Sequence, residues 1–92
     1  MRARRREVVD EYVEDGLAAV YSQDGVVVLL SELATTAWEV LGEQWAAADD
    51  VAAELVRVFG APPEGGAEQL TADALRSLAE MHLVELDEGA LA

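Results

Sequence analysis

The 92-residue sequence contains no cysteine, and its six basic residues are all arginine. Without cysteine there is no disulfide, no thiolate metal ligand and no thiol nucleophile, which agrees with a reducing compartment. The longest apolar runs fall well short of the ~18 residues that a membrane-spanning helix needs. The arginine-rich start is followed by acids, where a signal peptide would have an apolar segment. We therefore expect a soluble, cytoplasmic protein.

The arginines are concentrated at one end of the chain. Four of the six lie in the first six residues: Arg2, Arg4, Arg5 and Arg6. Residues 7–92 therefore carry two arginines against 19 acids, a net charge of −17. We interpret residues 1–6 as a disordered basic tail and residues 7–88 as one domain. The alternative for the tail is a contact to nucleic acid or to an acidic partner.

One run of five apolar residues stands out: Val26, Val27, Val28, Leu29 and Leu30. A turn signal precedes the run, and Ser31 after it can cap a helix. Because side chains alternate along a strand, both faces of this strand are apolar. A chain of this length rarely covers both faces of a small sheet, so one face would be available to a partner. The alternative is a central strand that its own domain buries.

The remaining pattern predicts three strands followed by three helices. Val8–Val13 and Leu17–Tyr21 precede the apolar run and form a three-stranded antiparallel meander with it. The turn signals between these strands are Asp15-Gly16 and Asp24-Gly25. Apolar residues at helical spacing then predict helices over residues 31–42, 49–60 and 71–82. Asp49 or Asp50 would cap the second helix and Thr71 the third, and residues 83–86 would be extended.

This order of elements predicts an α+β domain whose helices pack on one face of the sheet. Its helical part is winged-helix-like, a unit that DNA-binding proteins insert into the major groove. Such a recognition helix carries basic and amide side chains. The third helix here offers only Arg76, beside Asp73 and Glu80. A DNA-binding regulator is therefore a disfavoured alternative.

Residues 26–42 resemble the strand-to-helix segment of PqqD-like proteins, in which a valine-rich strand runs into Leu-Asn-x-x-Ala and an apolar helix. The residues at 73–75, followed by Leu78, resemble the third-helix signature of that family. The similarity spans residues 8–86. Two features depart from the pattern: Ser31 replaces the usual asparagine, and the third helix runs directly into residues 83–84.

The resemblance implies a RiPP recognition element, a non-catalytic module for ribosomally made and post-translationally modified peptides. It implies that the leader segment of a precursor peptide adds as a strand beside Val26–Leu30 and is then delivered to a protease, cyclase or radical enzyme. Strand addition suits an apolar edge strand because its backbone groups are unpaired. By position, the wall on the third helix is Leu75, Leu78, Ala79 and His82. A monomer or weak dimer is expected.

The individual wall residues have competing interpretations. Leu75 and Leu78 are better explained as core residues, whereas Ala79 and His82 are the better candidates to face a peptide. Arg76 would pair with an acidic residue of the leader or be solvated, and an exposed pair contributes only ~0–1 kcal/mol.

Catalytic and cofactor signals are weak. His82 is the single histidine, and no motif places a base beside an alcohol. The acid pairs do not have the spacing of a calcium-binding loop. The sequence also contains no glycine-rich phosphate-binding loop. We therefore expect no enzyme activity, metal or cofactor. An acidic carrier protein is a further alternative, but the Asp-Ser pair that such carriers modify is absent.

Overall fold

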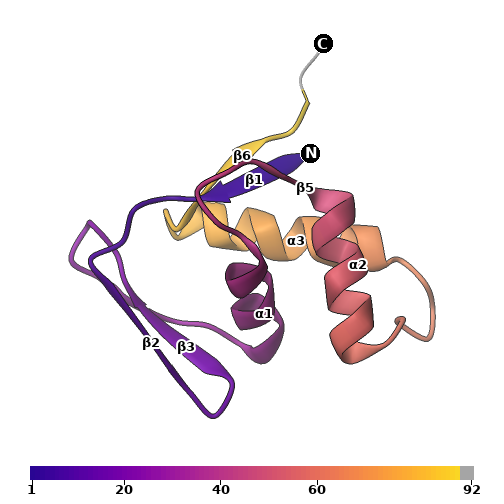
Figure 1. The fold of residues 1–92 in the computed structure, drawn as a ribbon, viewed down its shortest axis with the longest axis horizontal. Helices are drawn as coiled ribbons and strands as arrows, with labels where there is room; N and C mark the ends of the chain where they lie inside the picture. Colours follow the sequence, from indigo (N-terminus) through magenta and orange to yellow (C-terminus); the bar gives the residue numbers. More distant parts are fainter. Residues whose placement is uncertain (90–92) are drawn as a thin grey trace.

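The computed structural model describes residues 1–89, which form six strands and three helices (Figure 1). The strands are β1 (Arg2–Arg5), β2 (Asp10–Glu14), β3 (Leu17–Tyr21), β4 (Val27–Leu29), β5 (Ala46–Ala47) and β6 (Val84–Asp87). The helices are α1 (Glu32–Val40), α2 (Ala48–Phe59) and α3 (Ala67–Glu80). In this part of the chain no helix has the length and apolar character needed to cross a membrane.

The first sheet is the predicted antiparallel meander, with the strand order β2-β3-β4. Gly16 and Gly25 have positive φ angles, 78° and 79°, in the two turns that connect its strands. Glycine adopts this conformation without a steric cost, so the two turn signals in the sequence identified both hairpins. The expected α+β fold class, with a three-stranded antiparallel sheet and three helices, is confirmed.

Helix α1 begins where the sequence predicts. The Ser31 hydroxyl oxygen accepts a hydrogen bond from the backbone N–H of Ala34 at 3.2 Å, so Ser31 is the N-cap. One turn later, the buried Thr35 hydroxyl accepts the backbone N–H of Ala18 at 2.9 Å. This bond ties α1 to β3 and fixes the helix on the inner face of the sheet.

Two predicted helix starts are wrong. Helix α2 begins after Ala47, and Asp49 and Asp50 lie in its first turn, where acids favour the positive end of the helix dipole. Helix α3 begins at Ala67, four residues before the predicted cap Thr71. Thr71 is buried inside the helix, where it packs instead of capping.

The first residues form a strand, so the prediction of a disordered tail is wrong. β1 is the central strand of a second sheet with the order β5-β1-β6. Arg2 lies opposite Asp87 and Arg4 opposite Glu85, and each pair is an ion pair, at 2.9 Å and 3.3 Å. Strand β6, at residues 84–87, covers all but the first residue of the extended segment expected at 83–86.

Two tryptophans contact the arginines of β1. The guanidinium groups of Arg2 and Arg4 lie over the ring of Trp45 at 4.7 Å and 4.4 Å, and Arg5 lies over Trp38 at 4.1 Å. Arg5 also donates to the Trp38 carbonyl oxygen at 2.9 Å and 3.0 Å. Cation–π contact and ion pairing thus order an arginine-rich segment that its composition alone marks as solvated.

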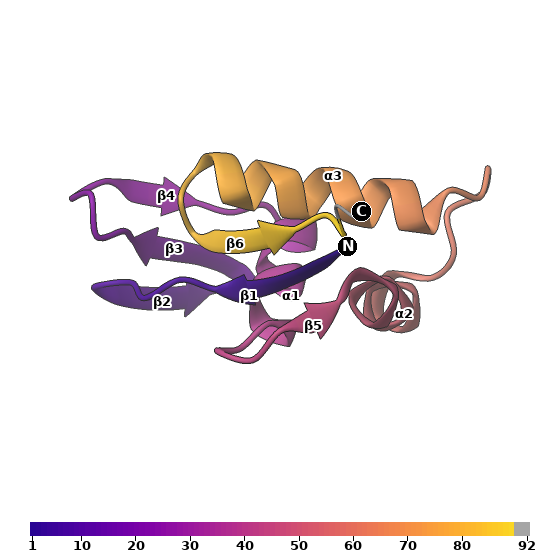
Figure 2. The same cartoon turned by 90° about the horizontal axis from the view of Figure 1, so that it is seen from above.

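The core lies between the two sheets and the three helices. Trp38, Leu75, Leu78 and Leu83 are its largest wholly buried apolar side chains. Ala3 belongs to the same cluster with no exposed surface, so the expected domain boundary before residue 7 is also wrong. From above, β4 and α3 lie on the same side of the molecule, beyond β3 (Figure 2). Helix α3 packs chiefly on α1, α2 and β6.

Candidate functional site

The open edge of β4 is the first component of the candidate site. Within residues 1–89, β4 pairs with β3 alone, and its second edge has no neighbouring strand. The alternative of a central strand buried by its own domain is therefore not realised. The backbone N–H of Leu30 donates to Ala18, and the carbonyl oxygen of Val26 accepts from Ser22.

These two bonds identify the backbone groups that point away from β3. Backbone polar groups in an antiparallel strand alternate between the two edges, residue by residue. Because Val26 and Leu30 bond towards β3, Val28 does so as well, in register with Val20. Val27 and Leu29 therefore direct their N–H and C=O groups to the open edge. Four backbone groups are thus available to an added strand.

The side chains of this segment divide as their alternation predicts. Leu30 is buried in the core and Val28 packs against it, whereas Val27 and Leu29 are exposed on the outer face, Leu29 by 78%. Val26 is exposed in the turn before β4. Of the five predicted strand residues, Val28 and Leu30 therefore pack on the core, and Val27 and Leu29 form an apolar outer surface.

The residues of α3 also divide. Leu75 and Leu78 are wholly buried in the core, which agrees with their interpretation as core residues. Ala79 is half-buried and packs against the core cluster. Leu75 and Leu78 can therefore position the helix beside a peptide, but their side chains have no surface to offer one.

His82 follows the end of α3 and lies beside the turn that joins β3 to β4. It lines a hollow of about 240 Å³ together with Arg6, Glu7, Gln23 and Asp24. His82 is exposed and has a φ of 62°. Of the predicted helix-wall residues, it is therefore the one that shares a surface hollow with the β3–β4 turn.

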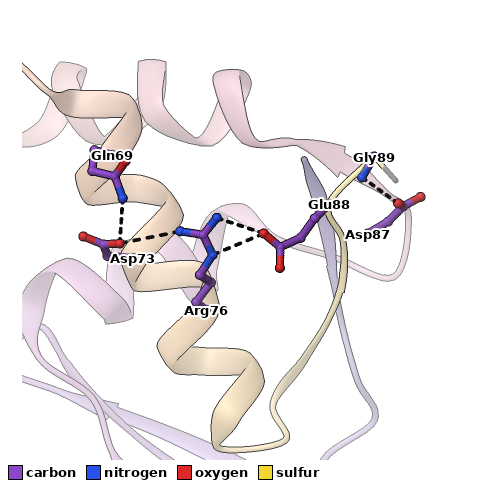
Figure 3. A network of polar contacts seen from close by, with 6 residues as sticks. All are labelled: Gln69, Asp73, Arg76, Asp87, Glu88 and Gly89. Atoms are coloured by element: carbon purple, nitrogen blue, oxygen red, sulfur yellow. Dashed lines mark hydrogen bonds and ion pairs between the residues drawn. The ribbon is translucent and has the colours of Figure 1, made fainter. Parts of the chain in front are cut away.

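Arg76 is paired within the chain. Its guanidinium donates to Glu88 at 2.8 Å and 3.2 Å and lies 3.7 Å from Asp73, so it points towards the segment after β6 (Figure 3). The hydrogen bond to Glu88, and then its charge, raise the pKa of Arg76 above its ordinary value. A contact between Arg76 and an acidic leader residue would have to replace this pairing.

The ionisable groups of residues 1–89 that have shifted pKa values lie at the surface. No group of three or more metal-ligating side chains is found within residues 1–89. The raised or lowered pKa values belong to exposed ion pairs, such as Glu54 with Arg57, in which the Arg57 hydrogen bond lowers the pKa of Glu54. Ion pairs of this kind are typical of a solvated surface.

Sequence reasoning predicted the strand of the candidate site but not which of its backbone groups are open. The pairing register between β3 and β4 determines which residues direct their N–H groups to the open edge. Once the β3–β4 turn is placed, the register follows from its length. The turn signal Asp24-Gly25 was therefore the feature of the sequence from which the open groups could have been identified.

Comparison with known proteins gives one informative result. No family model matches the chain, and no curated protein does. Among solved structures, the chain is similar to TbiB1 in complex with the TbiA(beta) leader peptide. The TM-score is 0.71 at 20% sequence identity, over 97% of this chain and 99% of that one. The two proteins therefore share a fold along nearly their whole length.

Proposed function

We propose that this protein is a non-catalytic recognition module that binds the leader segment of a ribosomally made precursor peptide. The observation that carries the proposal is the open β4 edge, with the backbone groups of Val27 and Leu29 directed outwards. The likeness of the fold to TbiB1, which was solved with a leader peptide bound, supports the same function. PqqD-like proteins and RiPP biosynthesis are the corresponding family and process.

In strand addition, the binding free energy comes from both the backbone and the side chains of the peptide. A backbone hydrogen bond has a net value of only ~0.5–1.5 kcal/mol, so four of them are a weak basis for affinity. A few apolar side chains of the peptide must therefore provide much of the binding free energy. The exposed side chains of Val27 and Leu29 alternate with the inward Val28, which suits a peptide whose own apolar residues alternate.

The module would deliver its bound peptide to a separate modifying enzyme, such as a protease, cyclase or radical enzyme in a lasso-type or radical-enzyme pathway. The described residues offer recognition without a catalytic constellation, so the chemistry would belong to that enzyme. Short reading frames beside this gene are the natural source of the precursor. We place the protein in the cytoplasm, where such precursors are made.

The proposal is tested by a matched pair of substitutions. Val27 and Val58 are each 48% exposed, one on β4 and the other on α2. Val27→Asp places a charge that must be desolvated against an apolar peptide, so we expect affinity for the cognate leader to fall more than about tenfold. Val58→Asp makes the same chemical change away from the edge and should leave affinity unaltered.

Isothermal calorimetry with leader peptides encoded beside the gene measures both variants. Circular dichroism first establishes that each variant is folded. The proposal fails if the wild-type chain binds none of these peptides, or if the two folded variants bind equally well.

A further inference from the structure

The outer face of the β2-β3-β4 sheet carries an unusual amount of exposed apolar surface. The side chains of Leu17, Ala19 and Tyr21 on β3 point outwards, since the alternating Ala18 and Val20 are buried. The pairing register places neighbours beside them on the same face. Tyr12, Ala19 and Leu29 form one row across the three strands, and Tyr21 lies beside Val27 in the next.

These residues form a contiguous surface, which we call the outer patch: Tyr12, Leu17, Ala19, Tyr21, Val27 and Leu29. Tyr12 is 65% exposed and Leu29 78% exposed. The Cβ atoms of directly opposed residues in a sheet lie ~4.5–5.5 Å apart, so the members of each row are neighbours. Scattered apolar residues on a surface are ordinary, but a continuous patch of this kind is typical of an interface.

Acidic side chains border the outer patch along β2. Asp10 and Glu14 flank Tyr12 on the same face, and Asp15 follows in the turn. Within residues 1–89, none of these three carboxylates forms an ion pair with arginine, unlike Glu11, which pairs with Arg5 on the inner face. The border is therefore uncompensated negative charge.

This charge disfavours a second copy of the chain as the occupant. A second copy packed face to face on the outer patch would bring its own acidic border towards the border formed by Asp10, Glu14 and Asp15. Like charges brought together repel, and the chain as a whole carries a net charge of −13. A surface with lysine or arginine around an apolar centre would instead meet the acidic border with complementary charge.

We infer that the outer patch is a docking surface for a second protein, one whose contact surface is apolar at its centre and bordered by lysine or arginine. This surface is distinct from the open β4 edge: the docking protein covers the face of the sheet, whereas a peptide extends the sheet sideways. The two sites meet at Val27 and Leu29, so a protein and a peptide can be held next to each other. The inference goes beyond peptide binding and does not need it.

The test uses the full chain and two synthetic β-hairpin peptides with the same apolar face, one bordered by lysine and the other by glutamate. In ¹⁵N-resolved NMR titrations, the lysine-bordered hairpin should shift the amide signals of Tyr12, Ala19 and Tyr21. The glutamate-bordered hairpin should leave them unchanged. The double variant Tyr12→Ser/Leu17→Ser keeps every charge, and its affinity for the lysine-bordered hairpin should fall more than about tenfold.

Three results would overturn the inference. Equal shifts at Asp49 and Asp50, the acids at the start of α2, would show general charge attraction. Shifts confined to β4 would show that the hairpin adds as a strand. A dimer in sedimentation that Leu17→Ser abolishes would assign the patch to a second copy. Leader affinity of the double variant should equal that of the wild type, so failure of this inference is distinguishable from failure of peptide binding.

Discussion

His82 combines a place in the candidate site with a strained backbone. Its φ of 62° lies in the left-handed region, and its N–H donates to the Ala79 carbonyl oxygen at 3.0 Å as α3 ends. This position after a helix favours glycine. A left-handed conformation costs ~1–2 kcal/mol for a residue with a side chain, and glycine loses ~0.5–1 kcal/mol more chain entropy on folding.

We therefore expect His82→Gly to stabilise the fold by about 0.5–1 kcal/mol. Urea unfolding measures the change. Glu80→Gly, at the exposed last residue of α3, is the control and should destabilise, by less than the ~1 kcal/mol that glycine costs inside a helix. Equal destabilisation by the two changes would contradict the strain argument. A loss of leader affinity in the stabilised His82→Gly chain would assign the imidazole to peptide contact.

Asp87 links the ends of the described chain through an exposed carboxylate. The backbone N–H of Gly89 donates to it at 2.9 Å, and Arg2 donates at 2.9 Å, and both contacts lower the pKa of Asp87. A carboxyl group with a lower pKa in the folded state stabilises the fold above its unfolded pKa of about 4. That contribution is lost as the pH falls through the folded pKa.

Asp87→Asn removes this titration. The urea midpoint of the wild type should exceed that of Asp87→Asn at neutral pH, and the gap should close as the pH is lowered below about 4. Because the pair is exposed, added salt should also narrow the gap at neutral pH. A difference that stays constant between neutral and acidic pH would show that the ionised carboxylate contributes nothing.

At the scale of the element, β1 is a strand that the composition of the sequence did not predict. Four arginines in six residues are typical of a solvated tail, yet ion pairs with β6 and the ring of Trp45 hold two of them. Each contact joins residues more than 40 positions apart, so no local pattern predicts it. The alternation that marks a strand is carried here by one apolar residue, Ala3, between arginines.

Two alanine-to-aspartate changes in the β5-β1-β6 sheet test this element. Ala3 has no exposed surface, so Ala3→Asp buries a charge and should destabilise by more than about 3 kcal/mol. Ala47 is exposed and is the N-cap of α2 without a side-chain capping bond. Ala47→Asp supplies that bond and should stabilise by up to about 1 kcal/mol. If Ala3→Asp is tolerated as well as Ala47→Asp, β1 is not part of the folded core.

At the scale of the whole molecule, turn chemistry and apolar periodicity were enough to predict the meander, the order of the helices and the start of α1. Those features depend on neighbours in sequence, such as the glycine in each hairpin and Ser31 before α1. The second sheet and the pairing of Arg76 with Glu88 depend on contacts between residues distant in sequence. The candidate strand was therefore predicted, whereas the arrangement around it was not.

Strand β4 carries no charged residue, although the molecule is strongly acidic. Acids dominate the surface beyond residue 6, but the segment from Val26 to Leu30 carries none. Of the two outer edges of the meander, β2 bears Asp10, Glu11 and Glu14, whereas β4 is wholly apolar. Charged edge strands resist pairing, so β4 is the edge of the meander better suited to an added strand.

Amide hydrogen exchange tests the central claim most directly, because strand addition protects particular N–H groups. In the free protein, the amide of Val28 should already exchange slowly through its pairing with β3, while those of Val27 and Leu29 exchange faster. With the cognate leader bound, Val27 and Leu29 should become protected and Val28 should change little. Bound leader that leaves the exchange of Val27 and Leu29 unaltered would contradict strand addition at β4.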